Sequence, residues 1–545
     1  MSHSMQGLRR GLRSSAGPHL KRYPERERSL SRLLADQART FPERDWVIFD
    51  SRERLTFGAA YEASLRVAGR MVEQLPARPR VGLLLGNRPE FLIALHGTLL
   101  AEGMAFLIDP DLPPRSLCPM LERAGLHMVI GDERSAAALD ETLPSLAAKP
   151  ARVLVNVGPG ANAPGIETWQ AWLSHARPLD VTEFPHYNQD ALVMYTSGTT
   201  GMPKGAVLSH HYAFAYGAIA TDSLHRNEND VLTGPLPLFH SSGLQMVAHS
   251  ALHAGCIAHL KTRFSASRFW EEVAADGATQ GNLVPEMARM ILQRAQIAPA
   301  HHMRHISIGG LADCADFEQR FNVKVLWQGY GMTEAYPCPM GLAPWGGPED
   351  TLGMPMDYLE YGVSGEDGRL LAPGETGELV LRAAPHGLFE RYFGDEAATA
   401  KAFRDGLFHT GDQVSMGESG ALAFRGRGGE RIRHHGENVD PRAVEAAALD
   451  YPGVSEAAAY GVPSELGEDV KLDVVAAGAL ALPELHAWLK TQLPRHALPR
   501  YLERRDTLPR TANLKLRTFQ LRAEGVARDG VFDSRQPAEG LRPGG

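Results

Sequence analysis

Several features that mark specialised proteins are scarce or missing in this sequence. Cysteine occurs four times in 545 residues and never as a C-x-x-C pair, which argues against a zinc site and against a disulfide framework. Arg88 and Glu90 interrupt the most apolar region, 81–112, well short of the roughly 20 residues that a membrane span needs. The formal net charge is -8, whereas nucleic-acid-binding proteins usually carry a basic excess. We therefore expect a cytoplasmic protein with no transmembrane segment and no nucleic-acid partner.

Two common catalytic signatures are also missing. The chain has no G-x-S-x-G nucleophile elbow and no H-E-x-x-H zinc motif. The histidine pairs His210-His211, His301-His302 and His434-His435 are adjacent, so the two members of each pair cannot share one helix face as metal ligands. These absences argue against a serine hydrolase of that type and against a zinc peptidase.

The length and the 43% apolar composition predict at least two domains. From 81 to 328, short apolar runs alternate with helical patterns, which is typical of a parallel α/β sheet. From 353 to 424, short β-type runs separated by Gly, Asp and Pro predict an antiparallel subdomain. A helix, two strands and a helix between 442 and 492 predict a small α+β unit. The fold class is therefore α/β, with a large N-terminal domain of parallel α/β sheets plus a β subdomain, and a small mobile C-terminal α+β domain.

The predicted division of the chain places its boundaries in glycine-rich and charged stretches. A transit peptide is the alternative for the basic N-terminal segment, but Gly17, Pro18 and Pro24 would interrupt its amphipathic helix, so we expect a disordered leader. The expected parts are the leader (1–28), the N-terminal domain (29–425), a hinge (426–430), the C-terminal domain (431–524) and a disordered tail (525–545).

The strongest local signal is the segment YTSGTTGMPKG, residues 195–205. It follows the apolar run 191–195 and therefore leaves the end of a strand, where ligands bind in open α/β sheets. Glycines let backbone N–H groups approach a phosphate, hydroxyl groups add donors, and Lys204 adds a positive charge. The segment is not a Walker A loop, because neither Ser nor Thr follows Lys204. The residues expected to bind phosphate are Thr196, Ser197, Gly198, Thr199, Thr200 and Lys204.

Further motifs follow in order along the chain. GYGMTE (329–334) follows the apolar run 323–328, and it contains Glu334, whose carboxylate is a ligand that Mg²⁺ prefers. TGD (410–412) also ends an apolar run, and an acidic residue such as Asp412 can accept both ribose hydroxyls. Each of these two motifs alone is a common turn. The remaining segments are LPLFHSSG (236–243), GR (426–427) and PRTANLK (509–515).

This ordered series, from about 30 to 522, resembles the adenylate-forming superfamily and, within it, the AMP-binding acyl-CoA synthetases. The resemblance implies that Tyr330 stacks on adenine, that Glu334 holds Mg²⁺ and that Lys515 neutralises charge on the α-phosphate. It further implies that His240 lies near the carboxylate or gates an acyl tunnel. The catalytic residues so implied are Thr196, His240, Glu334 and Lys515, and the nucleotide-binding residues are Thr196, Ser197, Gly198, Thr199, Thr200, Lys204, Gly310, Gly329, Tyr330, Gly331, Thr333, Asp412 and Arg427.

Two positions depart from the family pattern. Leu514 stands where similar enzymes have a glycine before the catalytic lysine, and Gly429 stands where they have Asp or Lys as the hinge between two half-reactions. Glycine absorbs large φ/ψ changes, so rotation of the small domain stays feasible. The departures therefore bear on the geometry of Lys515 and on thioester formation, and not on the adenylation site.

The expected function is ATP-dependent activation of a carboxylic acid to an acyl-adenylate, with Mg²⁺, and then thioester formation with coenzyme A. The motifs at 236–243 and 509–515 resemble those of medium- or long-chain and carnitine-type ligases. The alternatives are a stand-alone adenylating enzyme that loads an acyl carrier protein or another acceptor, and a weakened nucleotide-binding regulatory protein. Amino-acid-activating relatives have an Asp near the place of His240, which argues against an α-amino acid substrate.

A further expectation concerns the pocket that binds the acid. The stretches expected to line its pocket are 240–243, 282–286, 310–311 and 335–340, whereas Met287 and Met290 are expected in the core. A homodimer is expected by analogy with the relatives alone.

Overall fold

The fold is described from a computed structural model of the chain. It describes residues 8–11, 17–155, 166–196, 203–295, 297–309, 314–326, 329–340, 351–353, 355–383, 387–427, 432–434, 437–464, 467–476, 478–510, 516–526, 528 and 530–535.

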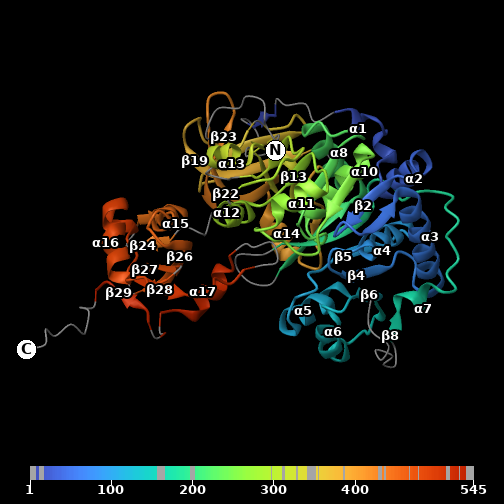
Figure 1. Cartoon of the computed structure of the whole chain (residues 1–545), viewed down its shortest axis with the longest axis horizontal. Coiled ribbons are helices and arrows are strands. Elements are labelled where there is room, and N and C mark those ends of the chain that lie inside the picture. The colour runs from blue at the N-terminus through green and yellow to red at the C-terminus, as the bar shows by residue number, and fades with distance from the viewer. Residues whose placement is uncertain are drawn as a thin grey trace, which may run out of the picture.

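Two large sheets form the centre of the N-terminal part (Figure 1). Most of their neighbouring strands are parallel, as the alternation of strands and helices predicts. The strands read as near-continuous apolar runs because both faces of each sheet are covered. The first sheet has the order β20 (Arg391–Tyr392), β10 (Lys204–Ser209), β9 (Asp190–Thr196), β5 (Met104–Leu107), β4 (Arg80–Leu84), β6 (Met128–Gly131), β7 (Ala151–Leu154) and β8 (Ile166–Thr168). The second has the order β15 (Lys324–Leu326), β14 (His305–Ser307), β13 (Gln280–Asn282), β11 (Val231–Gly234), β12 (Ile257–Leu260), β2 (Asp45–Phe49) and β3 (Glu53–Thr56).

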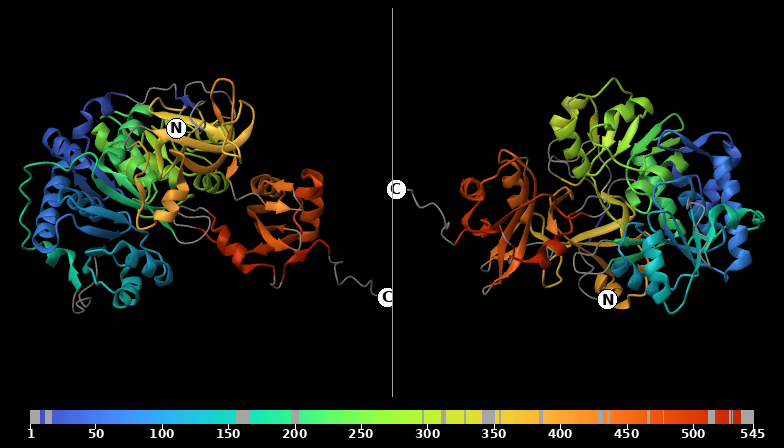
Figure 2. Two further views of the ribbon diagram at one scale, coloured as in Figure 1. Left: turned by 180° about the vertical axis from the view of Figure 1, so that it is seen from behind. Right: turned by 60° about the horizontal axis from the view of Figure 1, so that its bottom comes forward.

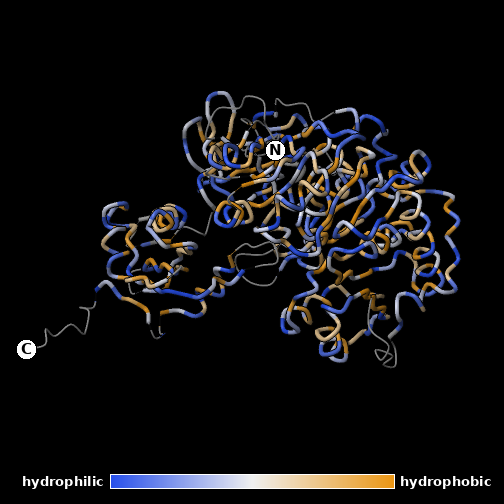
Figure 3. Tube along the Cα trace, in the orientation of Figure 1, coloured by the Kyte–Doolittle hydropathy of each residue, from blue (hydrophilic) through white to orange (hydrophobic). Residues whose placement is uncertain are grey.

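Helices fill the space between the two sheets and cover their outer faces. The largest core cluster joins both sheets through the central helices, and hydrophobic residues gather along these buried elements (Figure 3). The central helices are α2 (Leu30–Thr40), α3 (Phe57–Gln74), α4 (Pro89–Leu100), α8 (His210–Ser223), α9 (Ser241–Gly243), the π-helix Leu244–His249 and α10 (Ser250–Ala254). The outer helices are α5 (Pro114–Ala124) and α6 (Ala136–Thr142) on the first sheet, and α11 (Phe269–Ala275), α12 (Pro285–Arg294) and α13 (Cys314–Phe321) on the second. The short α7 (Trp169–Leu173) follows β8.

The expected antiparallel β subdomain is confirmed. Its strands are β18 (Leu359–Ser364), β19 (Thr376–Ala383), β21 (Phe403–Arg404), β22 (Leu407–Met416) and β23 (Leu422–Arg427), with helix α14 (Glu396–Ala402) beside them. A separate hairpin consists of β16 (Tyr330–Met332) and β17 (Ala335–Met340). One strand of this region, β20, leaves the subdomain and pairs with β10 of the first sheet. The hairpin, β20 and β22 all carry residues to the candidate site.

The C-terminal α+β unit is also confirmed, and it stands beside the larger part in every view (Figures 1 and 2). Its sheet contains β24 (Ile432–His434), β25 (Glu437–Val439), β26 (Val454–Ser464), β27 (Gly467–Ala476), β28 (Tyr501–Arg505) and β29 (Phe532–Asp533). Its helices are α15 (Pro441–Leu449), α16 (Leu482–Gln492) and α17 (Thr518–Glu524). A separate apolar cluster gives this unit its own core.

The expectation of a disordered leader is wrong for the part of 1–28 that the structure describes. Arg9 and Arg10 form strand β1, which pairs with β18. Residues 18–21 form helix α1, whose Leu20 is buried and whose His19 imidazole contacts the Asp222 carboxylate at 2.7 Å. The segment is basic and interrupted by Gly and Pro, but Leu20 and Tyr23 reach the core of the large domain, so its described residues are held by tertiary contacts.

Two other boundary expectations need correction. Within the expected tail, 525–545, strand β29 pairs with β28, and the Asp533 carboxylate accepts from the Arg500 guanidinium at 3.2 Å. Gly426 and Arg427, which were assigned to the hinge, are the last two residues of β23. The ladder between β22 and β23 therefore extends further than the glycine content of this stretch implied.

In the described part of the chain, no helix is both long and apolar enough to cross a bilayer.

Candidate active site

The predicted phosphate loop connects two antiparallel strands. Sequence reasoning placed a strand before the loop but did not predict β10 after it. Thr196 and Lys204 are opposite each other in the ladder, and the Thr196 hydroxyl lies 3.4 Å from the Lys204 carbonyl oxygen. The base of the loop is thus a closed hairpin at the carboxyl end of β9, while Ser197, Gly198, Thr199 and Thr200 lie outside the described residues.

Glu334 lies in the turn between β16 and β17 and is 5% exposed. The turn is anchored on both sides, because the Tyr212 hydroxyl donates to the Thr333 carbonyl at 3.0 Å and the Phe389 amide donates to the Glu334 carbonyl at 2.9 Å. A buried carboxylate beside a phosphate loop is a suitable ligand for Mg²⁺, which keeps several waters and binds through one or two carboxylates plus substrate phosphates. In the described residues, no group of three or more His, Cys, Asp and Glu side chains could hold a metal by itself.

Tyr392 connects these two predicted residues, and sequence reasoning missed it. Its hydroxyl donates to Oε1 of Glu334 at 2.8 Å, and Nζ of Lys204 lies 5.0 Å from the centre of its ring. Tyr392 reaches this place because β20 adds to the edge of the first sheet beside β10, with Tyr392 opposite Ala206. No motif surrounds it in the sequence, so only the pairing of β20 with β10 could have identified it.

The predicted nucleotide residues Tyr330 and Asp412 are in direct contact. The Tyr330 hydroxyl donates to Oδ2 of Asp412 at 2.5 Å, and both side chains are buried. Arg427 is opposite Asp412 in the ladder between β22 and β23, so its backbone lies where the motif order predicted. Gly309 and Gly329 also meet at the ends of β14 and β15, because a Cβ on Gly309 would lie 3.8 Å from the Gly329 carbonyl oxygen.

The His240 segment is held by two asparagines at strand ends. Asn87 follows β4; its side-chain amide donates to the carbonyls of Leu236 and Lys261 at 3.0 and 2.9 Å, and its oxygen accepts from the Leu238 amide at 2.8 Å. Asn282, expected to line the acid pocket, donates to the Ser242 carbonyl at 3.2 Å. Sequence reasoning missed Asn87, because nothing in its local sequence indicates a contact 149 residues away.

Gly243 closes the same segment at a position where no side chain fits. A Cβ there would lie 2.3 Å from the carbonyl oxygen of Pro237 and 2.5 Å from that of Leu236. The glycine in the motif is therefore required by a close approach of backbone to backbone. It lets the chain turn from His240 directly into α9.

Several predicted residues cannot be placed. Gly310, Gly429 and Lys515 lie outside the described residues, and the description of Arg427 covers its backbone alone. The expected pocket segment 310–311 is also outside, and the side chains of 336–340 are not described. Met287 is buried and Met290 packs against the same cluster, as expected.

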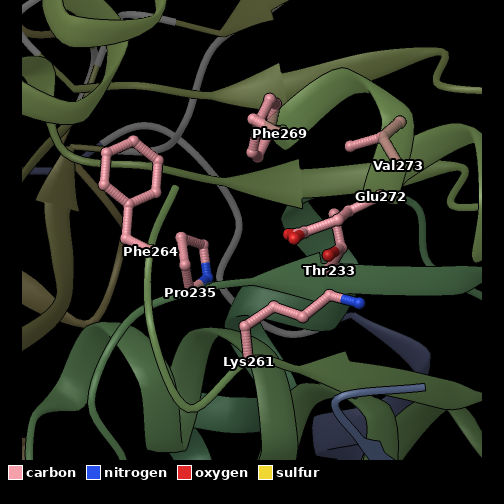
Figure 4. Close-up of a pocket in the computed structure, with 7 residues that line it drawn as sticks. All are labelled: Thr233, Pro235, Lys261, Phe264, Phe269, Glu272 and Val273. Atoms are coloured by element: carbon pink, nitrogen blue, oxygen red, sulfur yellow. The ribbon is translucent and has the colours of Figure 1, made fainter. Parts of the chain in front are cut away.

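Two hollows lie near these elements. One is lined by Pro203, Gly205 and Tyr195 on the hairpin and by Arg123 and Phe393 beside it. The other contains none of the predicted site residues; its lining is Thr233, Pro235, Lys261, Phe264, Phe269, Glu272 and Val273 (Figure 4). Lys261 is the cationic group of this second hollow, and its ammonium is paired with Asp276 at 2.5 Å and with Ser51 at 2.9 Å. That pairing gives Lys261 a structural role between β12 and α11.

Comparison with protein families matches both parts of the chain. The AMP-binding enzyme family matches residues 34–393, and the AMP-binding enzyme C-terminal domain matches residues 443–515.

Curated relatives cover most of the chain. A medium/long-chain fatty-acid–CoA ligase of Mycobacterium marinum is 30% identical over 494 residues, which is 87% of this chain and 91% of the relative. A 2-succinylbenzoate–CoA ligase of Geobacillus kaustophilus is 30% identical over 504 residues, covering 90% and 96%. A sulfoacetate–CoA ligase of Cupriavidus necator is 30% identical over 524 residues, covering 91% and 98%.

Solved structures share the fold over a similar length. An o-succinylbenzoate coenzyme A synthetase from Bacillus subtilis, in complex with AMP, superposes with a TM-score of 0.77 at 25% identity, covering 90% of this chain and 97% of that one. An anthranilate CoA ligase in complex with anthranoyl-AMP has a TM-score of 0.81 at 19% identity, covering 92% and 98%.

Proposed function

The chain belongs to the AMP-binding enzyme family, and on that premise we propose that it activates a carboxylic acid with ATP and transfers the acyl group to coenzyme A. The observation that carries the proposal is the contact of Lys204 and Glu334 with opposite parts of one residue, Tyr392. A cation for phosphate oxygens and a carboxylate for Mg²⁺ are thereby held beside one hairpin at a strand end, the place where α/β sheets bind nucleotides.

The roles of the described residues follow from their chemistry. Lys204 and the hairpin base at Thr196 would hold the β- and γ-phosphates, and Glu334 would hold Mg²⁺, which supplies charge neutralisation at the phosphates. Tyr330 presents its ring for adenine while its hydroxyl holds Asp412, whose carboxylate would accept the ribose hydroxyls. The relatives named as CoA ligases support coenzyme A as the acceptor.

The proposed reaction has two steps. The substrate carboxylate attacks the α-phosphorus of ATP, so that a carboxyl–phosphate bond forms and pyrophosphate leaves. The thiol of coenzyme A then loses its proton and attacks the acyl carbonyl, so that a thioester forms and AMP leaves. We propose that Lys515 stabilises charge in the first step alone, and that rotation about Gly429 exchanges the faces of the small domain between the two steps.

The first experiment is ATP–pyrophosphate exchange over a panel of carboxylic acids that includes medium- and long-chain fatty, aryl and short polar acids. The same acids are then incubated with coenzyme A, and the products are read by mass. Exchange with formation of an acyl-CoA supports the proposal and identifies the acid class. Exchange without acyl-CoA would point to a carrier protein or another acceptor. No exchange, together with no ATP binding by calorimetry, would overturn the proposal.

A second experiment tests Lys515. The variant Lys515→Ala should lose acid-dependent exchange by at least about a hundredfold, yet retain thioester formation from a pre-made acyl-adenylate. Lys490→Ala, a surface lysine of the same unit, is the matched control. Equal loss in both half-reactions would contradict a role confined to the first step.

Location and assembly are further proposals. In the described part of the chain, Cys118 and Cys256 are not joined in a disulfide, which suits a reducing compartment such as the cytoplasm. A homodimer is testable by light scattering of the purified chain.

A further inference from the structure

Tyr392 is the described side chain that contacts both the phosphate-loop lysine and the candidate magnesium ligand. The ammonium of Lys204 lies over its ring at 5.0 Å, within the distance at which a cation is attracted to an aromatic face. The hydroxyl at the far end of the same ring donates to Glu334 at 2.8 Å. A hydrogen bond from a phenol to a carboxylate increases electron density in the ring, so the two contacts strengthen each other.

The ring itself is held firmly. The Tyr392 ring packs against Phe389 in a tilted arrangement at a centroid distance of 4.8 Å, and Phe389 in turn stacks on Phe403 at 5.2 Å. The Tyr392 amide donates to the Thr399 hydroxyl at 3.0 Å. A side chain that is fixed by packing and by hydrogen bonds of its own backbone can hold its neighbours in one geometry.

The segment that carries Tyr392 is joined to both partners through its backbone. The Glu390 amide donates to the Val207 carbonyl at 2.8 Å, and the Phe393 amide donates to the Gly205 carbonyl at 2.7 Å, so the segment is paired with the strand that begins at Lys204. The Phe389 amide donates to the Glu334 carbonyl at 2.9 Å. Segment 389–393 therefore connects the phosphate hairpin to the turn that holds Glu334.

We propose that Tyr392 is a positioning residue that holds Lys204 and Glu334 at the spacing required by the phosphates and Mg²⁺ of one nucleotide. The inference rests on the proposed function, since it takes MgATP as the ligand. Lys204 contacts the ring face and Glu334 accepts from the hydroxyl, so the cation and the carboxylate contact different parts of one rigid group. The ring sets the distance between them.

The two contacts can be separated by substitution. Tyr392→Phe removes the hydroxyl and leaves the ring, so the Lys204 contact stays and the Glu334 contact is lost. Affinity for ATP is measured by calorimetry with Mg²⁺ and, separately, with EDTA. We expect Tyr392→Phe to weaken binding of MgATP by about tenfold and to change binding of ATP in EDTA by less than about twofold. Tyr392→Leu, which also removes the ring, should weaken both.

A double-mutant cycle tests whether Tyr392 acts through Glu334. On the Glu334→Gln background, where the Mg²⁺-linked part of the affinity is already lost, Tyr392→Phe should have no further effect. Tyr212→Phe is the matched control, because it removes a hydroxyl that donates to the same turn at the Thr333 carbonyl; any loss it causes should be equal with Mg²⁺ and with EDTA.

The outcomes separate this inference from the proposed function. If the unaltered chain binds ATP neither with Mg²⁺ nor with EDTA, the proposed function fails. If it binds ATP, and Tyr392→Phe loses no Mg²⁺-linked affinity or loses it equally on the Glu334→Gln background, the positioning role of Tyr392 is overturned. Thermal unfolding of each variant identifies any that fails to fold, and Tyr392→Phe, which keeps the packed ring, decides the question if Tyr392→Leu does fail.

Discussion

The Tyr330 hydroxyl donates to the Asp412 carboxylate at 2.5 Å, across 82 residues of sequence. Tyr330 begins the hairpin that follows the second parallel sheet, whereas Asp412 belongs to the antiparallel subdomain. The bond therefore joins two parts of the large domain at the place where the nucleoside of ATP would lie. It also orients the ring that would stack on adenine.

We predict that Tyr330→Phe weakens ATP binding by about tenfold, because a buried hydrogen bond to a charged group contributes roughly 1.5–3 kcal/mol. Asp412→Asn should weaken it at least as much, and the double variant should lose less than the sum, since the two side chains act together. Calorimetry with ATP measures each loss. Tyr460→Phe is the matched control, because Tyr460 likewise donates to a buried aspartate, Asp473, at 2.8 Å in the C-terminal unit. Additive losses would show that Tyr330 and Asp412 act independently.

Asn87→Ala should raise the KM for the acid and lower stability by about 2 kcal/mol, because the backbone groups of Leu236, Leu238 and Lys261 would lose their partner. The effect on the KM follows from the position of Leu236 and Leu238, just before His240. The measurements are initial rates over a range of acid concentration and a urea unfolding curve. Asn229→Ala, on the surface, is the control. If the variant is destabilised but its KM is unchanged, Asn87 does not influence binding of the acid.

Lys471→Met should destabilise the C-terminal unit by about 3 kcal/mol, because it leaves two buried carboxylates, Asp473 and Glu503, with Arg505 in place of two buried cations. The Lys471 ammonium contacts Glu503 at 2.6 Å and the Gly525 carbonyl at 2.8 Å, and it is fully buried. Hydrogen exchange of β27 and β28, which reports this unit separately, should accelerate. Lys490→Met provides the exposed control, and equal protection in the two variants would contradict the prediction.

Stability should fall as the pH falls below about 6.5, the pKa of an unfolded histidine. Burial lowers the pKa of His96 to about 3 and that of His210 to about 4, because the charged imidazolium is disfavoured away from water. Between these pKa values and 6.5 the unfolded chain binds protons that the folded chain does not. Each such histidine therefore lowers the free energy of unfolding by about 1.4 kcal/mol for each unit by which the pH falls. Above 6.5 both states are neutral and this dependence vanishes.

The variant His96→Leu should therefore flatten the slope of unfolding free energy against pH between 6.5 and 5. It should not lower stability at pH 7.5, since neither ring nitrogen of His96 has a hydrogen-bond partner in the described part of the chain. Denaturant unfolding at several pH values measures both effects, with His175→Leu on the surface as the control. An unchanged slope would mean that His96 is not the group responsible.

The sequence by itself determined the fold class and the order of the site motifs. Strand and helix periodicities are local properties, so the parallel sheets, the β subdomain and the small α+β unit were predictable. The motifs containing Thr196, Glu334 and Asp412 were found for the same reason, since glycine, hydroxyl and acidic residues at strand ends are visible in a short window. The hairpin partner β10 was missed, because an apolar run after a loop does not indicate which strand it joins.

Only the tertiary structure decided which distant residues complete the site. Tyr392 reaches Lys204 and Glu334 because β20 leaves the antiparallel subdomain and pairs with β10, and Asn87 reaches the His240 segment from the end of another strand. The same holds at the termini, where β1 pairs with β18 and β29 pairs with β28 although both segments read as disordered. Pairings between residues tens to hundreds of positions apart depend on the packing of the whole chain, and no local pattern of residue types records them.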